Sequence, residues 1–192
     1  MSVLLHICCA PCSVECIDAL REEGFDLHGY WYNPNIQPYT EYRARRDTLV
    51  EYAKTVNLPL ELVNEYDLRA WVRMLPSLDD RCGSCYSQRL EKAAEFAAAN
   101  GFEAYTTTLL ISPYQRHELI RGIGEQIGAK HGVEFLYRDF RPRFRDGQNR
   151  AREMGLYMQK YCGCVFSEEE RYVLSKKKKK QQKEELKQKG DA

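Results

Sequence analysis

The chain has 192 residues, of which 43% are hydrophobic and 30% are charged, and its formal net charge at pH 7 is +1. These values are ordinary for a soluble globular protein with one substantial core. No apolar run approaches the length that a bilayer-spanning helix needs, and the short apolar run near the start lacks the basic segment of a signal peptide. The sequence therefore predicts a cytoplasmic protein that does not contact membranes.

The positive charge is concentrated near the carboxyl terminus. Residues 175–192 contain eight lysines against two glutamates and one aspartate. We expect residues 1–174 to form a single α/β catalytic domain that carries the cysteines, and residues 175–192 to form a disordered or frayed helical tail. Such a tail attracts phosphates without sequence preference, or it serves solubility alone.

Short apolar runs alternate with amphipathic segments along the predicted domain. Strands are expected at 3–7, 26–32, 59–63, 103–108 and 133–137. Helices are expected at about 14–20, 39–56, 67–74, 82–100, 118–129 and 148–159, with an arginine-rich loop at 139–147. This alternation predicts an α/β fold with a Rossmann-like, open and mainly parallel sheet of about five strands and helices on both faces.

Three cysteines follow the first predicted strand. Cys8, Cys9 and Cys12 lie between that strand and the first turn of an amphipathic helix. Ligands bind at the carboxyl ends of strands in open α/β sheets, and backbone N–H groups at a helix N-terminus lower the pKa of nearby thiols. The turn contains no glycine, which argues against a nucleotide-binding phosphate loop at this place.

The eight cysteines are more than packing requires in a cytoplasmic protein. Such thiols, kept reduced, indicate metal or redox chemistry. A second pair, Cys82 and Cys85, begins the fourth predicted helix. Two cysteine pairs from separate loops supply the four thiolates that an iron–sulfur cluster needs. Tetrahedral zinc is the alternative, and its ligands would be Cys9, Cys12, Cys82 and Cys85.

The remaining cysteines have a different character. Cys162 and Cys164 are separated by one glycine, a spacing that can close a tight and labile disulfide or supply two further metal ligands. Cys16 lies one turn inside the first predicted helix, and we interpret it as a small buried side chain.

Several motifs occur together in this chain and in one known family. They are Cys-Cys-Ala-Pro-Cys-Ser at 8–13, Tyr-Asn-Pro-Asn-Ile at 32–36, Glu41-Tyr42 with Arg45, Cys82-x-x-Cys85-Tyr86 with Arg89, Thr-Thr-Leu-Leu-Ile-Ser-Pro-Tyr-Gln at 107–115, and Tyr-Cys-Gly-Cys-x-Phe-Ser at 161–167. With these motifs in order, residues 3–172 resemble the QueH family, the cobalamin-independent epoxyqueuosine reductases. The basic tail lies outside the resemblance.

The resemblance implies an oxidoreductase that converts epoxyqueuosine to queuosine at the wobble position of tRNA, by two-electron removal of the epoxide oxygen. It implies a [4Fe-4S] cluster held by Cys8, Cys9, Cys82 and Cys85, and a redox-active pair formed by Cys162 and Cys164. Cys12 belongs to the first motif and is a candidate ligand of one additional metal ion. The implied partners are tRNA carrying epoxyqueuosine in its anticodon loop and an electron donor that the sequence does not identify.

This reaction needs a proton donor and contacts to tRNA. The candidate proton donors, chosen by proximity to the motifs, are His6, Asp80 and Tyr114. Arginine and aromatic side chains contact phosphates and stack on unpaired bases. The candidates for these contacts are Tyr32, Arg45, Arg89, Tyr114, Arg141, Arg143, Phe144 and Arg145.

Two other functions are compatible with the residues alone. A zinc-stabilised nucleic-acid-binding module without redox activity would be colourless and would unfold with a chelator. Another cluster-dependent tRNA-modifying enzyme, such as a thiolation protein, would activate its base with ATP, and the composition of the first turn argues against that. The spread of matching motifs favours the reductase over both.

Overall fold

The computed structural model describes residues 1–77 and 80–175. The predicted lysine-rich tail lies outside the described residues from position 176 onward, and the division at 174 stays a prediction. The elements in chain order are β1 (Ser2–His6), α1 (Ala10–Glu22), β2 (Asp26–Trp31), α2 (Tyr39–Thr55), β3 (Leu60–Leu62), α3 (Leu68–Met74), α4 (Arg81–Ala99), β4 (Ala104–Thr107), η1 (Thr108–Ile111), α5 (His117–His131), β5 (Glu134–Phe135), η2 (Arg141–Arg143), α6 (Phe144–Glu153), α7 (Val165–Glu169) and η3 (Glu170–Leu174).

The strands form one parallel sheet in the order β3-β2-β1-β4-β5. The central strand β1 contributes Val3, Leu4 and Leu5, which are all fully buried. Burial on both faces explains why this strand is a continuous apolar run instead of an alternating one. The predicted open, parallel α/β sheet is confirmed.

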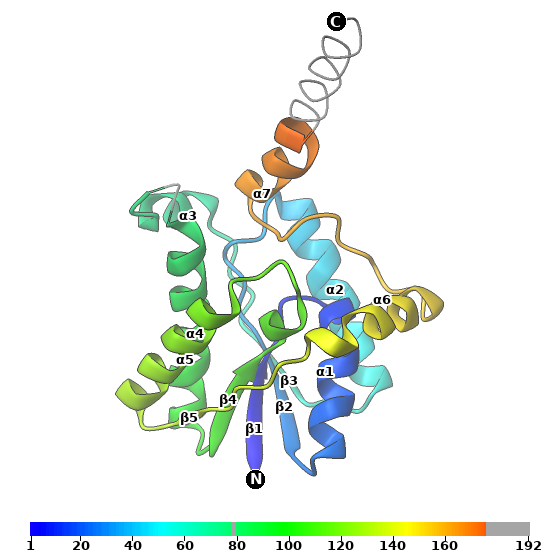
Figure 1. Cartoon of the computed structure of the whole chain (residues 1–192), viewed down its shortest axis with the longest axis vertical. Helices are drawn as coiled ribbons and strands as arrows, with labels where there is room; N and C mark the ends of the chain where they lie inside the picture. Colours follow the sequence, from blue (N-terminus) through cyan, green and yellow to red (C-terminus); the bar gives the residue numbers. More distant parts are fainter. Residues whose placement is uncertain (78–79, 176–192) are drawn as a thin grey trace, which may run out of the picture.

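Helices cover both faces of the sheet. In Figure 1, α1, α2 and α6 lie to the right of the sheet, and α4 and α5 lie to the left. The chain leaves β1 toward β2 and later returns to the other side of β1 through β4. The carboxyl end of β1 is therefore the point at which the strand order reverses, and such switch points form the ligand-binding crevices of open α/β sheets.

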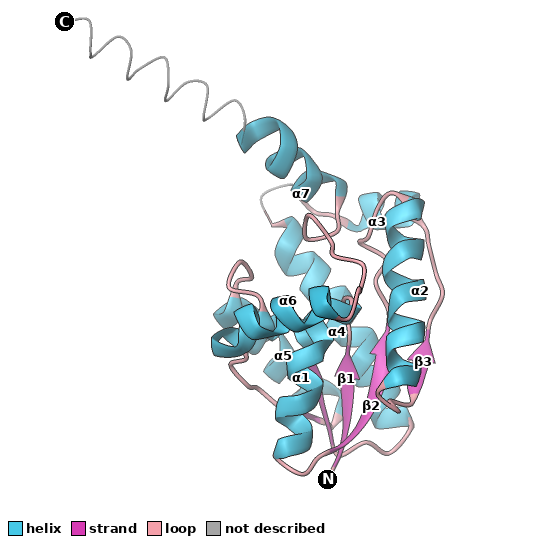
Figure 2. Cartoon of the chain, turned by 90° about the vertical axis from the view of Figure 1, so that its right-hand side faces the viewer, coloured by secondary structure: helices cyan, strands magenta, loops and turns pink. Residues whose placement is uncertain are grey.

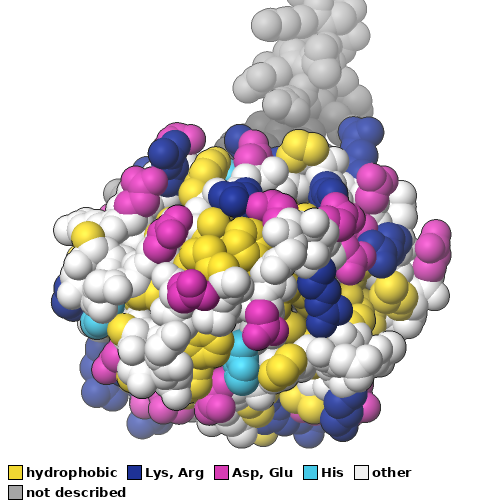
Figure 3. Space-filling model, turned by 90° about the horizontal axis from the view of Figure 1, so that it is seen from below, with side chains coloured by type: hydrophobic (Ala, Val, Ile, Leu, Met, Phe, Trp, Pro, Cys, Tyr) yellow, Lys and Arg dark blue, Asp and Glu magenta, His cyan; other side chains and the backbone are white. Residues whose placement is uncertain are grey.

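The two ends of the strands lead to different surfaces. The amino terminus lies at one end of the molecule and α7 lies at the other (Figure 2). On the face seen from below, charged side chains of both signs are interspersed with hydrophobic ones (Figure 3). None of the helices among the described residues is both long enough and apolar enough to span a bilayer.

The sixth helix begins earlier than predicted. The predicted loop at 139–147 contains the turn η2 and the start of α6, and α6 ends at Glu153 instead of continuing to 159. Phe144 packs against the hydrophobic core, and Gly147 is buried against Glu15 of α1. Gly155 has a φ of +67°, a left-handed conformation that ends a helix. The packing of Phe144 against the core therefore explains the earlier start of α6, and the conformation of Gly155 explains its earlier end.

Helix α5 approaches β5 so closely that Gly128 has no room for a side chain. A Cβ at this position would lie 2.5 Å from the carbonyl oxygen of Val133 and 3.3 Å from the backbone nitrogen of Phe135. We expect Gly128→Ala to lower the free energy of unfolding by about 1–3 kcal/mol, measured by urea denaturation, because backbone atoms must shift.

The matched control lies on the same helix. Gly122 is exposed, and a Cβ there would meet nothing within 4 Å. Gly122→Ala should stabilise the protein by about 0.5–1 kcal/mol through helix propensity. Equal effects of the two substitutions would mean that α5 does not approach β5 this closely.

Candidate metal centre

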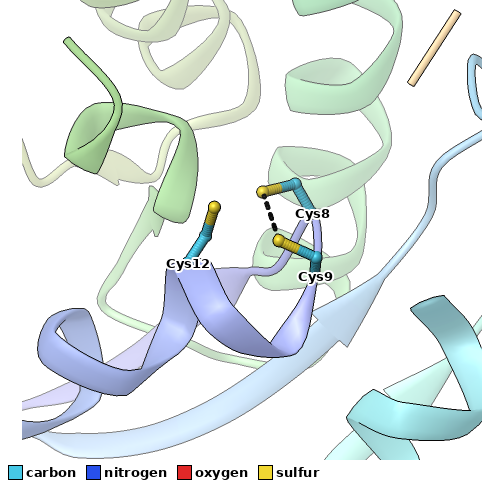
Figure 4. A group of neighbouring side chains, drawn as sticks. All are labelled: Cys8, Cys9 and Cys12. Carbon is cyan, nitrogen blue, oxygen red and sulfur yellow. Dashed lines mark hydrogen bonds between the residues drawn. The ribbon is translucent and has the colours of Figure 1, made fainter. Parts of the chain in front are cut away.

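Three sulfur atoms converge at the carboxyl end of the central strand. β1 ends at His6, and the chain passes through Cys8 and Cys9 into α1, where Pro11 occupies the first turn. The Sγ atoms of Cys8, Cys9 and Cys12 all lie within 4.8 Å of one another, with 3.7 Å between those of Cys8 and Cys9 (Figure 4). All three side chains are buried. Because thiolates are strong ligands for soft metals, this group is able to hold a metal centre.

The three thiols differ in how readily they lose a proton. Hydrogen bonds with Cys12 and Cys9 hold the pKa of Cys8 well below its ordinary value. Burial raises the pKa of Cys9, and the hydrogen bond to Cys8 raises the pKa of Cys12. The group therefore favours one thiolate at Cys8, and a metal bound here would displace the remaining protons.

A buried arginine connects this group to the second cysteine pair. Arg89 lies one turn after Cys85 on α4, and its side chain is 1% exposed. Its Nη1 lies 3.8 Å from Cys85 Sγ, and its Nη2 donates to Asn33 Oδ1 at 2.7 Å. Its charge also acts on Cys8 and Cys162, and its Nε has no hydrogen-bond partner among the described residues. A buried cation in such surroundings is stabilised by thiolates.

The second cysteine pair lies in the first turns of α4. Cys85 is buried, and burial raises its pKa to about 12. Cys82 is partly exposed, and burial raises its pKa as well. The sulfur group within 4.8 Å contains Cys12 together with Cys8 and Cys9, and neither member of the α4 pair belongs to it. The assignment of the α4 pair as cluster ligands stays a prediction.

Cys162 and Cys164 lie on the segment between α6 and α7, in a loop at 161–164 that we call the cysteine loop. Arg45 of α2 is 2% exposed and holds this loop from below the surface. Its Nη1 donates to the carbonyl oxygen of Cys162, and its Nη2 donates to that of Tyr161, both at 2.9 Å. Its Nε donates to Glu41 Oε1 at 2.7 Å. The cysteine loop is thus fixed by a buried ion pair on a distant helix.

The structure contains no support for a disulfide in the cysteine loop, because all eight cysteines are free thiols. Cys162 is exposed, and Gln115 Nε2 donates to its Sγ at 3.3 Å. Tyr86 donates its hydroxyl proton to Gln115 Oε1 at 2.5 Å. This second bond fixes the amide so that its nitrogen faces the sulfur.

Two further polar side chains contact the first sulfur group. Thr108 Oγ1 accepts from the backbone N–H of Cys8 at 3.1 Å and donates to Cys8 Sγ at 3.3 Å. Gln159 Nε2 donates to Cys12 Sγ at 3.4 Å. Sequence reasoning gave no role to these residues or to Gln115. The available indication was that Thr108 and Gln115 follow the carboxyl end of a strand adjacent to β1.

The candidate proton donors lie in different surroundings. His6 is fully buried, with Nδ1 2.8 Å from Thr107 Oγ1 and Nε2 3.2 Å from the carbonyl oxygen of Tyr32. Burial lowers its pKa to about 3, so the imidazole is neutral and its proton is held in a buried hydrogen bond. Asp80 is the N-cap residue of α4, whereas Tyr114 is exposed. We interpret His6 as a structural residue.

The predicted tRNA contacts divide into three sets. The prediction is wrong for three residues that are buried: Tyr32, Arg45 and Arg89. Two arginines are committed to ion pairs, Arg141 with Asp139 and Arg143 with Glu22. The others are exposed or partly exposed: Tyr114, Phe144 and Arg145.

A protein-family model described as "Epoxyqueuosine reductase QueH" matches residues 3–170. This chain belongs to that family. The epoxyqueuosine reductase QueH of Dehalococcoides mccartyi is 35% identical, over 88% of this chain and 94% of the relative. That of Thermotoga maritima is 38% identical, over 88% of this chain and 92% of the relative. The family resemblance of the motifs is thereby confirmed, and the QueH assignment does not favour the zinc-stabilised module.

A solved structure shares the fold. The U34-tRNA thiolase NcsA from Methanococcus maripaludis with its [4Fe-4S] cluster superposes with a TM-score of 0.58. The match covers 87% of this QueH chain and 61% of the thiolase, at 15% sequence identity. At this identity the likeness concerns the fold alone.

The buried ion pair under the cysteine loop is open to a stability test. Arg45→Met should lower the free energy of unfolding by about 3–5 kcal/mol, because it leaves the Glu41 carboxylate buried without its cation. Adding Glu41→Gln to this variant should recover part of the loss. Urea denaturation measures both effects.

The matched control is an exposed ion pair on the same helix. Lys54 pairs with Glu51 at 2.8 Å, with 68% and 74% of the two side chains exposed. Lys54→Met should cost no more than about 1 kcal/mol. If both substitutions to methionine had the same small effect, Arg45 would not anchor the cysteine loop.

Proposed function

We propose that this protein is a cytoplasmic iron–sulfur epoxyqueuosine reductase that acts on tRNA carrying epoxyqueuosine at the wobble position. The observation that carries the proposal is the position of Arg89 in a chain of the QueH family. This buried guanidinium lies 3.8 Å from Cys85 Sγ, and the charges of Cys85, Cys8 and Cys162 raise its pKa against the effect of burial. Thiols gathered around one buried cation at the carboxyl end of β1 suit electron transfer to a bound substrate.

We propose Cys8, Cys9, Cys82 and Cys85 as the ligands of a [4Fe-4S] cluster. The donor set fits this group, since soft thiolates select iron–sulfur clusters, and the buried cations Arg45 and Arg89 offset the negative charge of bound thiolates. Cys12 lies in the sulfur group with two of these ligands and is left as a donor for one additional metal ion.

The reaction removes one oxygen atom from epoxyqueuosine and gives queuosine and water, so it consumes two electrons and two protons. The cluster, when bound, supplies one-electron transfer. We propose that Cys162 and Cys164 supply both electrons and both protons, because oxidation of two thiols to a disulfide releases two of each, and that the cluster passes the electrons on one at a time. Two one-electron transfers from an external reductant, together with two protons from water, then restore the thiols. Desolvation of the sulfur raises the pKa of Cys162, and the hydrogen bond from Gln115 to this sulfur opposes the rise.

Metal analysis tests the ligand assignment. Protein purified without oxygen should be brown and contain about four iron and four sulfide per chain. Cys8→Ala or Cys85→Ala should remove most of this iron. Cys16→Ala is the matched control, since Cys16 is buried in α1 and lies outside the sulfur group. Stoichiometric zinc without a visible absorption band would contradict the cluster.

Turnover tests the role of the cysteine loop. Cys162→Ser should lower the rate of queuosine formation more than about 100-fold, with iron content unchanged, because an essential member of the thiol pair is lost. The rate is measured with dithionite as reductant, by mass analysis of nucleosides from digested tRNA. A rate equal to that of the unmodified protein would remove the cysteine loop from the mechanism.

A further inference from the structure

Tyr114 is the most exposed large hydrophobic side chain among the described residues. Its side chain is 85% exposed, whereas the next, Met154, is 48% exposed. A tyrosine in this position gains little from folding, since its ring covers no core. Exposed aromatic side chains of this kind become buried when a partner binds.

The exposure of Tyr114 is a fixed feature and does not come from a loose loop. Its ring contacts the ring of Phe144 edge to face, with centroids 6.1 Å apart and planes at 84°, and Phe144 packs against the core. Three hydrogen bonds of 3.2–3.3 Å join the surrounding turn to Ser112, from the backbone nitrogens of Tyr114 and Gln115 and from the ring of His117. The ring is therefore presented on a rigid support.

Tyr114 stands at the edge of the proposed active site. The next residue, Gln115, donates to Cys162 Sγ at 3.3 Å. Adjacent Cα atoms lie about 3.8 Å apart, so the tyrosine backbone is within one residue of the group that touches the thiol. The exposed ring and the exposed thiol thus belong to neighbouring parts of the surface, which this contact joins.

Two cations lie close to the aromatic pair in the sequence. Arg116 is two residues after Tyr114, and Arg145 is the residue after Phe144. Both are exposed, and neither forms an ion pair with any described carboxylate. Their neighbour Arg141, in contrast, pairs with Asp139 at 2.6 Å. Exposed cations of this kind beside aromatic rings are typical of surfaces that bind single-stranded nucleic acid.

We propose that Tyr114, supported by Phe144, stacks on the nucleobase next to the reacting nucleoside in the anticodon loop, and that Arg116 and Arg145 contact the phosphates on either side. This inference rests on the proposed function, because it takes the loop that presents epoxyqueuosine as the ligand. Gln115 and not Tyr114 contacts Cys162, so we assign the ring to a neighbouring base and not to the modified one.

The test measures binding separately from reduction. The full chain, purified without oxygen, is titrated with an unmodified anticodon stem-loop RNA at several salt concentrations. Tyr114→Ala should weaken binding about tenfold without changing the salt dependence, whereas Tyr114→Phe should stay within about twofold of the unmodified protein. Arg116→Ala and Arg145→Ala should each lower the slope of log affinity against log salt by about one.

Lys54→Ala is the control, because this exposed lysine lies at the end of α2 near the start of β3 and away from the cysteines. It should leave both the affinity and the slope unchanged. If Tyr114→Ala bound the RNA as tightly as the unmodified protein, or if the protein did not bind this RNA at all, the stacking proposal would be overturned.

The same variants separate this inference from the proposed function. In turnover assays, Tyr114→Ala should raise KM for epoxyqueuosine tRNA about tenfold and leave kcat unchanged, because stacking holds substrate and transition state alike. Tyrosine-dependent RNA binding without any queuosine formation would support the stacking surface and refute the reductase. Normal turnover with an unchanged KM in Tyr114→Ala would refute the stacking surface alone.

Discussion

The buried positive charge of Arg89 is the constraint on which the site depends. Removing a guanidinium from water costs several kcal/mol unless hydrogen bonds and negative charge compensate it. Asn33 accepts a hydrogen bond from one N–H group of Arg89. The charged groups that raise the pKa of Arg89 are cysteines. This cation opposes the burial that raises the pKa of Cys85, and it offsets the negative charge of thiolates that bind a metal.

The topology explains how distant segments meet at this cation. Parallel strands end at a common edge, so the residues after β1 and β4 are neighbours, and Thr108 bonds to Cys8. The crossover through α4 covers the opposite face of the sheet from α1 and brings Cys85 to the same edge. The carboxyl-terminal cysteines come last in the chain, and Arg45 of α2 holds their loop through the carbonyl oxygen of Cys162. Each cysteine group thus rests on a different helix of the fold.

Periodicity predicted the sheet well because β1 is buried on both faces and each crossover helix carries an apolar stripe. It placed the start of α6 wrongly, since Phe144 enters the core from a stretch whose arginines are typical of a loop. The meeting of the cysteine groups followed from the rule that strand ends converge. The inclusion of Cys12 in the tight sulfur group depends on how the first turn of α1 directs its side chains, which residue spacing does not specify.

The arginines were the least predictable part of the site. On hydropathy alone Arg45 and Arg89 belong on the surface, and beside tyrosines they resemble phosphate contacts. Both can be buried because Glu41, Asn33 and backbone carbonyl oxygens accept hydrogen bonds from their N–H groups. Such pairing is a property of the folded chain and leaves little trace in composition. Tyr114 shows the reverse case, since its ring, a candidate for stacking on a base, stays exposed and contacts one ring edge.

The bond from Arg45 to the carbonyl oxygen of Cys162 joins residues 117 positions apart. A ribosome makes the segments of a chain in order, so the cysteines of the first turn exist well before the loop that will lie beside them. During that interval the buried guanidinium of Arg45 lacks two of its hydrogen-bond acceptors, because both carbonyl oxygens belong to this late segment. The burial of Arg45 is therefore completed only when nearly the whole domain has been made.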